Sequence, residues 1–175
     1  KVDLLKKDNI RLREILSLQD SYNESISAAV ISRKTGSWWR QIILNKGSRD
    51  GVDIGSTVVG PGGLLGRLER TSVLTSSVRL LTSPESKVGV WVDRIKINGL
   101  LVGTGDDHPN LIIYSKDADI KVGDFVSSSP ASTLLPPNIP IGIVKSLEEP
   151  FQAKRIAKVL LLAKPQVIDW VQILK

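Results

Sequence analysis

The chain opens with an apolar pattern of helical period and changes to a strand-like pattern after about twenty residues. Over residues 1–22, apolar side chains recur every three or four positions, which is the spacing of one face of an α-helix. From residue 28 onward the apolar runs are short, and Gly, Pro, Asn and Asp separate them, as is typical of β-strands joined by turns. The pattern therefore predicts one helix followed by many short strands.

The helical segment fits a heptad repeat that starts with Val2 at position a. The a and d positions, which form the seam of a coiled coil, are Val2, Leu5, Asn9, Leu12, Leu16 and Gln19. A single Asn at an a position favours a defined register and a dimer, so the segment is predicted to be a dimerisation stalk. The alternative is a single amphipathic helix that packs on its own domain. Because a coiled coil of three heptads is only marginally stable in water, we expect the seam to continue upstream.

Three glycines, Gly47, Gly51 and Gly55, mark the stretch 45–55 between two apolar runs. Glycine permits positive φ, and Asp and Asn favour turns, so this stretch is predicted to contain tight turns that join two strands. In this setting Asp50 and Asp53 are expected to accept backbone hydrogen bonds rather than to act as a catalytic pair. A phosphate-binding loop is the alternative, but neither glycine-rich consensus motif is present and no helical pattern follows.

A weak internal repeat divides the strands into two sets. Residues 52–58 resemble residues 120–126, and each segment is followed by an apolar-Gly-apolar strand and then by another apolar strand. We therefore predict a mainly β fold in which an N-terminal coiled-coil helix precedes two small six-stranded β-barrels. The expected bounds are 1–22 for the coiled coil, 27–85 for the first barrel and 86–166 for the second. A last strand within 167–175 can close either barrel.

Composition bears on the context of the protein more than on its fold. The 175 residues include no Met and begin inside the apparent helix, so we expect the chain to be a processed or truncated piece of a longer protein. No apolar run approaches the roughly 20 residues that cross a bilayer, and any membrane anchor is expected upstream. The absence of Cys excludes disulfides and thiolate chemistry.

The net charge of +6 is concentrated near one predicted hairpin. Five basic residues and no acidic residue lie between Arg33 and Arg49, and Trp38 and Trp39 lie among them. This combination favours an anionic partner such as nucleic acid, and the alternative is a solvated hairpin or a protein contact. A second candidate contact is the irregular loop 127–140, which contains exposed-looking leucines and prolines. The candidate partner contacts are Trp38, Trp39, Arg40, Arg49, Leu134, Leu135, Pro136 and Pro137.

The sequence offers little for enzyme chemistry. His108 is the one histidine, and it lies in a predicted turn beside Asp106 and Asp107 without further nitrogen or sulfur ligands for a metal. A serine nucleophile on a Gly-x-Ser-x-Gly elbow does not occur. We therefore expect a protein that is not an enzyme and has no catalytic residue, cofactor or metal.

Several short motifs, in order along the chain, resemble one protein family. They are Trp39-Arg40-Gln41, residues 45–52, Gly63-Leu64-Leu65-Gly66-Arg67, residues 77–82, residues 99–105, Val122-Gly123-Asp124 and residues 136–142. As an ensemble these motifs make the chain similar to the rod shape-determining protein MreC family. The resemblance implies two extracytoplasmic β-barrels behind a coiled coil, with an upstream transmembrane helix in the inner (plasma) membrane and the barrels on the periplasmic side.

The resemblance also implies a function and partners. Members of this family are scaffolds of the cell-elongation machinery, form homodimers and in some cases larger assemblies, and connect penicillin-binding proteins, MreD and MreB filaments. The hypothesis from the sequence is therefore a non-enzymatic scaffold that organises peptidoglycan-synthesis enzymes and maintains cell shape, without binding nucleic acid. The alternatives are a nucleic-acid-binding β-barrel protein that uses the hairpin 33–49 and, less in keeping with the residues, a β-barrel protease.

Overall fold

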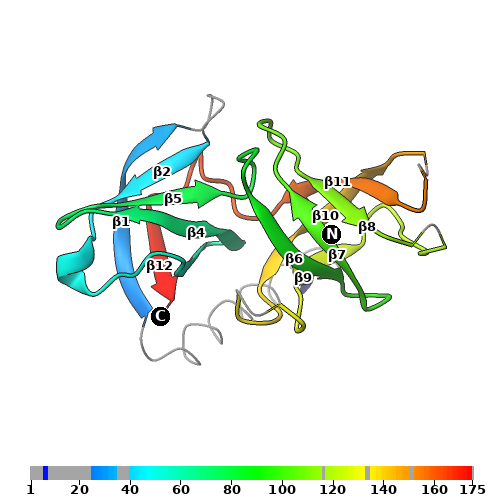
Figure 1. The fold of residues 1–175 in the computed structure, drawn as a ribbon, viewed down its shortest axis with the longest axis horizontal. Coiled ribbons are helices and arrows are strands. Elements are labelled where there is room, and N and C mark those ends of the chain that lie inside the picture. The colour runs from blue at the N-terminus through cyan, green and yellow to red at the C-terminus, as the bar shows by residue number, and fades with distance from the viewer. Residues whose placement is uncertain are drawn as a thin grey trace.

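The structure is a computed structural model that describes residues 6–7, 25–34, 40–115, 117–132, 135–149 and 152–174. The described residues form two closed six-stranded β-barrels that lie side by side along the long axis of the molecule (Figure 1). This confirms the predicted mainly β class with two six-stranded barrels. Of the predicted stalk, the structure describes Lys6 and Lys7, which are helical. The seam positions Val2, Leu5, Asn9, Leu12, Leu16 and Gln19 lie outside the described residues.

Barrel 1 combines the first five strands of the chain with the last one. Neighbouring strands around the ring follow the order β1, β12, β3, β4, β5 and β2. The strands are β1 (Ser25–Lys34), β2 (Gln41–Leu44), β3 (Thr57–Gly60), β4 (Gly63–Thr71), β5 (Ser76–Leu80) and β12 (Trp170–Leu174). The short 3-10 helix η1 (Ser48–Asp50) lies between β2 and β3.

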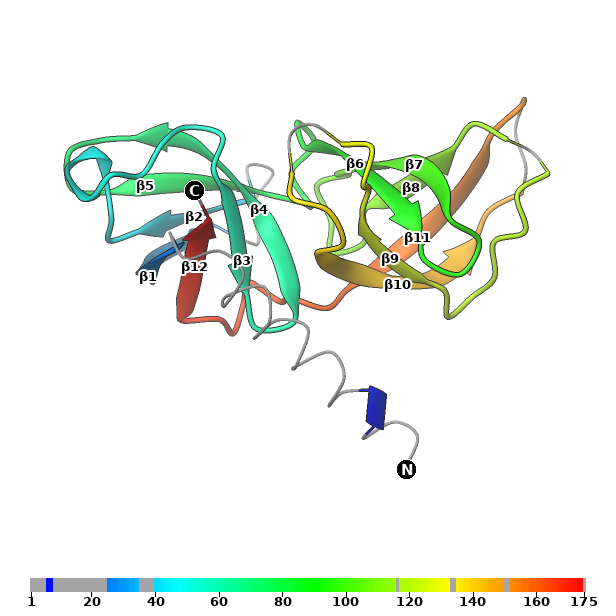
Figure 2. The same ribbon diagram turned by 90° about the horizontal axis from the view of Figure 1, so that it is seen from below.

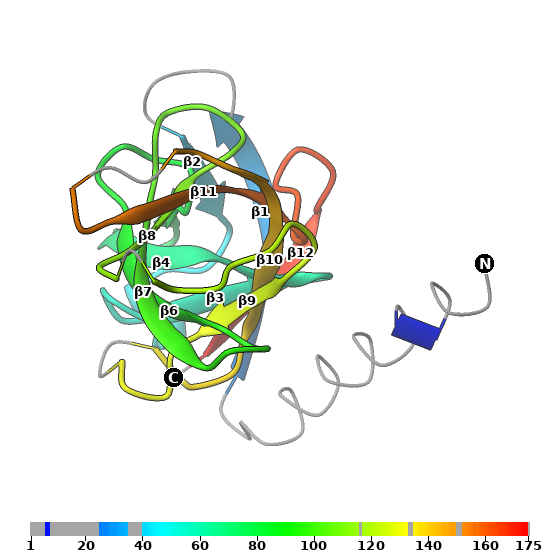
Figure 3. The same ribbon diagram turned by 90° about the vertical axis from the view of Figure 1, so that its right-hand side faces the viewer.

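Barrel 2 is built from six consecutive strands. Its ring order is β10, β11, β8, β7, β6 and β9. The strands are β6 (Lys87–Val92), β7 (Ile97–Val102), β8 (Asn110–Ile113), β9 (Phe125–Ser128), β10 (Pro140–Leu147) and β11 (Arg155–Leu161). Seen along the long axis, the two barrels lie one behind the other (Figure 3).

The two rings have the same order once β12 is placed where barrel 2 has β6. Read from that strand, barrel 1 runs β12-β1-β2-β5-β4-β3 and barrel 2 runs β6-β7-β8-β11-β10-β9. β12 pairs with β1, where Ser25 faces Leu174, and with β3, where Thr57 faces Leu174. The end of β12 therefore lies beside the start of β1 (Figure 1). Barrel 2 is inserted between β5 and β12, so barrel 1 closes with a strand that is distant in sequence.

Aliphatic side chains that point inward fill each barrel. Along β2, Ile42 and Leu44 are buried while Gln41 and Ile43 are half-buried, which is the alternation expected of a strand with one face on a core. The core of barrel 1 contains Ala28, Ile42, Leu44, Val52, Val58, Leu65, Leu68, Val78, Leu80, Ala163, Ile168, Val171 and Ile173.

The core of barrel 2 continues into the contact between the barrels. Val59, Leu64, Leu81 and Leu174 come from barrel 1 and its connection to barrel 2, yet they pack in one apolar cluster with barrel 2 residues. Gly63 at the start of β4 makes this approach possible, because a Cβ there would collide with the carbonyl oxygen of Pro140. Figure 2 shows β4 as the strand of barrel 1 that faces barrel 2.

The repeat found in the sequence is a structural repeat. Gly55 and Gly123 have φ values of 90° and 95° in matching turns before β3 and β9. The N–H of Gly55 donates to the carbonyl oxygen of Leu68 at 2.8 Å, and the N–H of Gly123 donates to that of Val144 at 2.9 Å. Each turn is therefore hydrogen-bonded to the second strand after it, β4 or β10, at the equivalent position.

Candidate interaction surfaces

Arg33, one of the five clustered basic residues, is engaged within the protein. Its Nε donates to the carbonyl oxygen of Pro165 at 2.9 Å, and its Nη2 donates to that of Ile168 at 2.5 Å. Nη2 also pairs with the carboxylate of Asp169 at 2.6 Å. Arg33 therefore holds the connection between β11 and β12 against β1, which the clustering of charge in the sequence did not indicate.

Arg40, which was predicted to contact a partner, is buried within the protein. Its Nε donates to the carbonyl oxygen of Gly105 at 3.0 Å, and its Nη1 pairs with Asp107 at 2.7 Å. The residue is only 9% exposed. Arg40 therefore ties barrel 1 to the β7–β8 loop of barrel 2, and the prediction of a free surface contact is corrected here. Trp38 and Trp39 lie outside the described residues.

The glycine-rich stretch forms the predicted turns. Asp50 accepts a hydrogen bond from the backbone N–H of Gly47 at 3.0 Å, and η1 ends at Gly51 with φ 85°. The backbone hydrogen bond predicted for Asp50 is thus confirmed. Asp53 is exposed, and its side chain makes no hydrogen bond among the residues that the structure describes. No phosphate-binding geometry is needed to explain these glycines.

Arg49 is exposed at the end of barrel 1, beside a small apolar tip. Its backbone N–H donates to the carbonyl oxygen of Val73 at 3.1 Å, which places η1 against the β4–β5 turn. Val73 and Leu74 in that turn are 63% and 53% exposed. Arg49 therefore stays a predicted partner contact. The apolar tip beside it was missed, because two apolar residues in a predicted turn carry no signal of their own.

Hydrogen bonds around Ser128 connect the described parts of the loop 127–140. The Ser128 hydroxyl donates to the carbonyl oxygen of Pro136 at 2.6 Å and accepts from the N–H of Ile139 at 2.8 Å. Leu135 is 5% exposed and belongs to the core of barrel 2, so its predicted role as an exposed contact is corrected here. Pro137 is exposed and Pro136 is half-buried. Both stay predicted contacts, and Leu134 lies outside the described residues.

His108 lies in the β7–β8 loop, as predicted. Asp106 accepts hydrogen bonds from the His108 N–H at 2.9 Å and the Thr104 hydroxyl at 2.8 Å, and these bonds lower the pKa of the Asp106 carboxyl. The described residues contain no group of three or more His, Cys, Asp or Glu side chains that is placed to hold a metal ion.

One ion pair closes an end of barrel 2. Arg94 in the β6–β7 turn binds Asp124 with Nε to Oδ1 at 2.8 Å and Nη2 to Oδ2 at 3.0 Å. Asp124 Oδ2 also accepts the Lys121 N–H at 2.8 Å. The hydrogen bonds from Arg94, followed by the one from Lys121, lower the pKa of Asp124, and the same pairing raises the pKa of Arg94. The sequence showed no sign of this pair.

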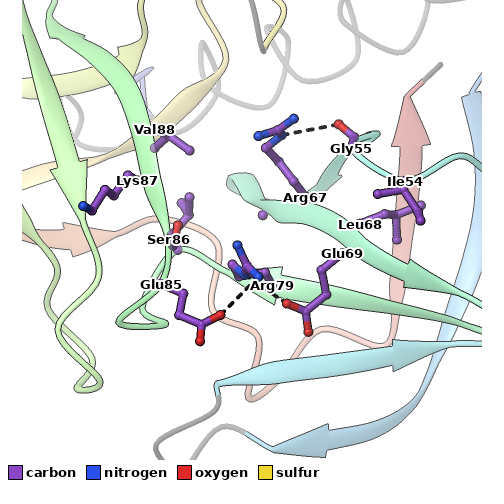
Figure 4. Close-up of a pocket in the computed structure, with 12 residues that line it drawn as sticks. Ile54, Gly55, Arg67, Leu68, Glu69, Arg79, Glu85, Ser86, Lys87 and Val88 are labelled. Atoms are coloured by element: carbon purple, nitrogen blue, oxygen red, sulfur yellow. Dashed lines mark hydrogen bonds and ion pairs between the residues drawn. The ribbon is translucent and has the colours of Figure 1, made fainter.

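A cleft of about 310 Å³ lies where β4 and β5 of barrel 1 meet the start of β6 (Figure 4). Arg79 is held there by two carboxylates, Glu69 at 2.9 Å and Glu85 at 3.1 Å. Arg67 donates to the carbonyl oxygen of Gly55 at 3.3 Å. Among the described residues Arg67 has no acidic partner.

A second groove of about 420 Å³ lies beside the connection between β11 and β12. Two of its apolar residues are well exposed, with Leu160 at 40% and Val167 at 75%. The hydroxyl of Thr82 lies in its wall without a hydrogen-bond partner among the described residues. Sequence patterns did not predict either hollow, because each is lined by segments that are far apart along the chain.

Comparison with known proteins assigns these barrels to a family. The family model described as rod shape-determining protein MreC, barrel core, matches residues 30–175. The chain belongs to the MreC family. The cell shape-determining protein MreC of Listeria monocytogenes is 33% identical over 151 residues, which are 82% of this chain and 51% of that relative. The chain thus spans about half the length of the curated MreC relatives that it matches.

Solved MreC structures share the two-barrel fold. One structure named MreC superposes with a TM-score of 0.82 at 27% identity and covers 98% of this chain and 99% of its own. A major periplasmic domain of the cell shape-determining filament MreC is 24% identical, with a TM-score of 0.72 and coverages of 86% and 94%. MreC from Helicobacter pylori, in a complex with the penicillin-binding protein PBP2, is 14% identical, with a TM-score of 0.67 and coverages of 87% and 98%. The last two likenesses show the fold alone.

The MreC relatives are named for cell shape and not for a reaction. Their names are consistent with a protein that is not an enzyme. Within the described residues, no helix of this MreC-family chain is long and apolar enough to cross a membrane.

Proposed function

We propose that this chain is the extracytoplasmic part of a non-enzymatic scaffold of the bacterial cell-elongation machinery. In this role it organises peptidoglycan-synthesis enzymes and so maintains cell shape. The observation that carries the proposal is the match to the MreC barrel core over residues 30–175, a span that includes nearly all of both closed barrels. The known partner of one fold relative, the penicillin-binding protein PBP2, supports a penicillin-binding protein as the main partner.

The joint between the barrels suits a scaffold. Three kinds of contact connect the two barrels: a shared apolar cluster, the close approach of Gly63 to Pro140, and the Arg40–Asp107 ion pair. Contacts of this kind hold the outer surfaces of both barrels at fixed relative positions, which a protein needs if it is to align two partners. The nucleic-acid alternative has no supporting observation, since Arg33 and Arg40 of the basic cluster are engaged within the protein.

The family resemblance extends the proposal to assembly and location. An upstream transmembrane helix anchors the protein in the inner membrane, and the heptad over 1–22 holds two copies together. MreD and the MreB filament are the further partners. Dimerisation raises the effective concentration of each binding site, so that weak individual contacts add up to stable recruitment. Asn9→Leu is expected to change the oligomeric state of a protein that includes the native upstream segment, as measured by analytical ultracentrifugation.

Photo-crosslinking of the full-length protein in its own cells tests the scaffold function. A photoreactive residue replaces Arg49 or Pro137, the exposed predicted contacts, and mass spectrometry identifies the proteins attached. Glu148, an exposed residue in the β10–β11 turn, is the matched control position. Recovery of a penicillin-binding protein at Arg49 or Pro137 but not at Glu148 supports the proposal. Recovery of RNA-associated cytoplasmic proteins instead would overturn both the function and the compartment.

A further inference from the structure

The cleft between the barrels places two arginines side by side. Arg67 on β4 lies directly opposite Arg79 on β5, and like charges in such a cross-strand pair destabilise a sheet. Glu69 and Glu85 neutralise Arg79. The charge of Arg67 is not compensated by an acidic side chain in the described part of the chain, where its hydrogen-bond partner is the carbonyl oxygen of Gly55. The pair would therefore be stabilised by an anion bound at Arg67.

The corresponding site in barrel 2 has no charge. The turn hydrogen bonds make Leu68 equivalent to Val144, so Arg67 corresponds to Ile143. Ile143 lies opposite Leu160, just as Arg67 lies opposite Arg79. The repeated ring therefore has an apolar pair in one barrel and an arginine pair in the other. The strand geometry by itself does not require arginine at this position.

The turn beside Arg67 also contacts its guanidinium, through the carbonyl oxygen of Gly55. A Cβ at Gly55 would lie 3.4 Å from Nη2 of Arg67, whereas a Cβ at Gly123, the equivalent residue of barrel 2, would meet nothing within 4 Å. Ile54, next to Gly55, is 68% exposed at the rim of the cleft. The buried side chains Leu68 and Val88 also line the cleft. Figure 4 shows Arg67 beside Gly55, with Ile54 at the same wall.

We propose that this cleft binds an acidic peptide segment of a partner protein. A carboxylate side chain of the segment pairs with the fork of Arg67, and a neighbouring apolar side chain packs on Ile54. A planar carboxylate matches the guanidinium with two parallel hydrogen bonds. Glu69 and Glu85 nearby disfavour a more highly charged phosphate, and the apolar wall favours a peptide. This inference rests on the proposed function, because it names the chemistry by which the scaffold binds an envelope protein.

Crosslinking at two equivalent turns tests the inference. A photoreactive residue replaces Ile54 or, as the matched control, Val122, which is 63% exposed in the same turn of barrel 2 but does not line the cleft. The full-length protein is crosslinked in its own cells, and the attached peptides are sequenced by mass spectrometry. The expected products at Ile54 are protein segments with Asp or Glu near the crosslinked residue, and these segments are absent at Val122. Phospholipid or non-acidic segments at Ile54 would overturn the inference.

The charge of Arg67 is tested in the same experiment. Arg67→Gln is expected to lower the crosslink yield at Ile54 about tenfold or more, since hydrogen bonds to charged groups are strong. Arg67→Lys keeps the charge without the fork and is expected to give an intermediate yield. Arg70→Gln is the matched control, because Arg70 is exposed on the same strand outside the cleft. Thermal melting checks that each variant is folded.

The outcomes separate this inference from the proposed function. If the crosslink yield is unchanged in Arg67→Gln and a penicillin-binding protein is still recovered at Arg49 or Pro137, the proposed binding in the cleft is wrong. The proposed scaffold function is then still supported. Failure to recover any envelope protein at any of the tested positions overturns both.

Discussion

Barrel 1 and barrel 2 have the same ring order and close it in different ways. Barrel 2 uses six consecutive strands, and its first two are joined by the short turn 93–96. In barrel 1 the strands at the equivalent place are β12 and β1, which are the last and the first strand in sequence and are not joined by a turn. Barrel 2 therefore closes through nearby segments, whereas barrel 1 closes only after the chain has passed through the whole of barrel 2. The same ring of paired strands thus forms with very different lengths of chain between its neighbouring strands.

The Arg94–Asp124 ion pair of barrel 2, here called the clamp, has no counterpart among the described residues of barrel 1. In barrel 2, Asp124 lies directly before β9 and forms an ion pair with Arg94 from the β6–β7 turn. The equivalent residue in barrel 1 is Ser56, since the N–H of Leu68 donates to Ser56 as the N–H of Val144 donates to Asp124. Among the described residues, no arginine forms an ion pair at the end of barrel 1 that corresponds to this one. The comparison leads to four predictions, from the largest expected effect to the smallest.

Deletion of residues 170–174 is expected to unfold barrel 1. β12 buries Val171, Ile173 and Leu174 at 1%, 0% and 3% exposure. Burial of each such side chain contributes about 1.5–3 kcal/mol, so the sum approaches the whole stability of a domain. Hydrogen exchange should show loss of protection in β1–β5 and retained protection in the interior of barrel 2. Unchanged protection of β2 to β5 would show that the last strand is dispensable.

A permuted chain is the control for this deletion. It begins with residues 162–174, continues through a copy of the turn 93–96, and ends with residues 25–81. If the missing turn is the main difference between the barrels, this chain should fold by itself and melt cooperatively. A permuted chain without cooperative melting would mean that the contact with barrel 2 is also required.

Gly63→Ala is expected to destabilise the protein more than Gly123→Ala. A Cβ at residue 63 collides with the backbone of Pro140 across the joint, whereas a Cβ at residue 123 meets open space. Both glycines have positive φ, 146° and 95°. We expect a loss of about 2–4 kcal/mol for Gly63→Ala and about 1 kcal/mol for Gly123→Ala in chemical denaturation. Equal losses would contradict a close joint at Gly63.

Asp124→Asn is expected to destabilise barrel 2 by about 1 kcal/mol, because it removes charged hydrogen bonds to Arg94. Ser56→Ala, the equivalent change in barrel 1, is expected to have a smaller effect. The folded pKa of Asp124 lies below its unfolded value, which is about 3.9. The stabilisation is therefore present above that value and is lost as the pH falls through the folded pKa. Urea unfolding between about pH 6 and 2 should show a weaker acid dependence in Asp124→Asn than in the wild type; parallel curves would contradict the clamp.

Ile54→Ser and Val122→Ser are expected to leave stability nearly unchanged, within about 0.5 kcal/mol, because both side chains lie mostly in water. The two variants should differ in binding. Ile54→Ser is expected to weaken recovery of the acidic partner segment, and Val122→Ser is not. Equal effects of the two variants on partner recovery would remove the distinction between the cleft and the equivalent turn of barrel 2.

Most of the strand pattern was predictable because it depends on local sequence. The alternation along β2, the Gly55 and Gly123 turns and the repeated strands after them are properties of short segments. The backbone hydrogen bond of Asp50 followed from the same turn chemistry. The predicted coiled-coil seam lies outside the described residues and stays a prediction.

The candidate contacts were less predictable because exposure depends on packing between distant segments. Leu135 looked like part of a surface loop and is a core residue of barrel 2. Arg40 looked like part of a basic surface and is buried against Asp107, which lies 67 residues further along the chain. A charge in a sequence does not show whether its counter-charge lies next to it in space.

The sequence by itself determined that this protein consists of short strands in two related sets, because strand alternation and turn chemistry act over a few residues. The tertiary structure decided that β12 closes barrel 1, that Arg40 joins the barrels, and that Arg67 lies opposite Arg79 without an acidic partner among the described residues. These outcomes depend on which distant segments become neighbours. Only closure of the two rings and burial of the shared core select those neighbours.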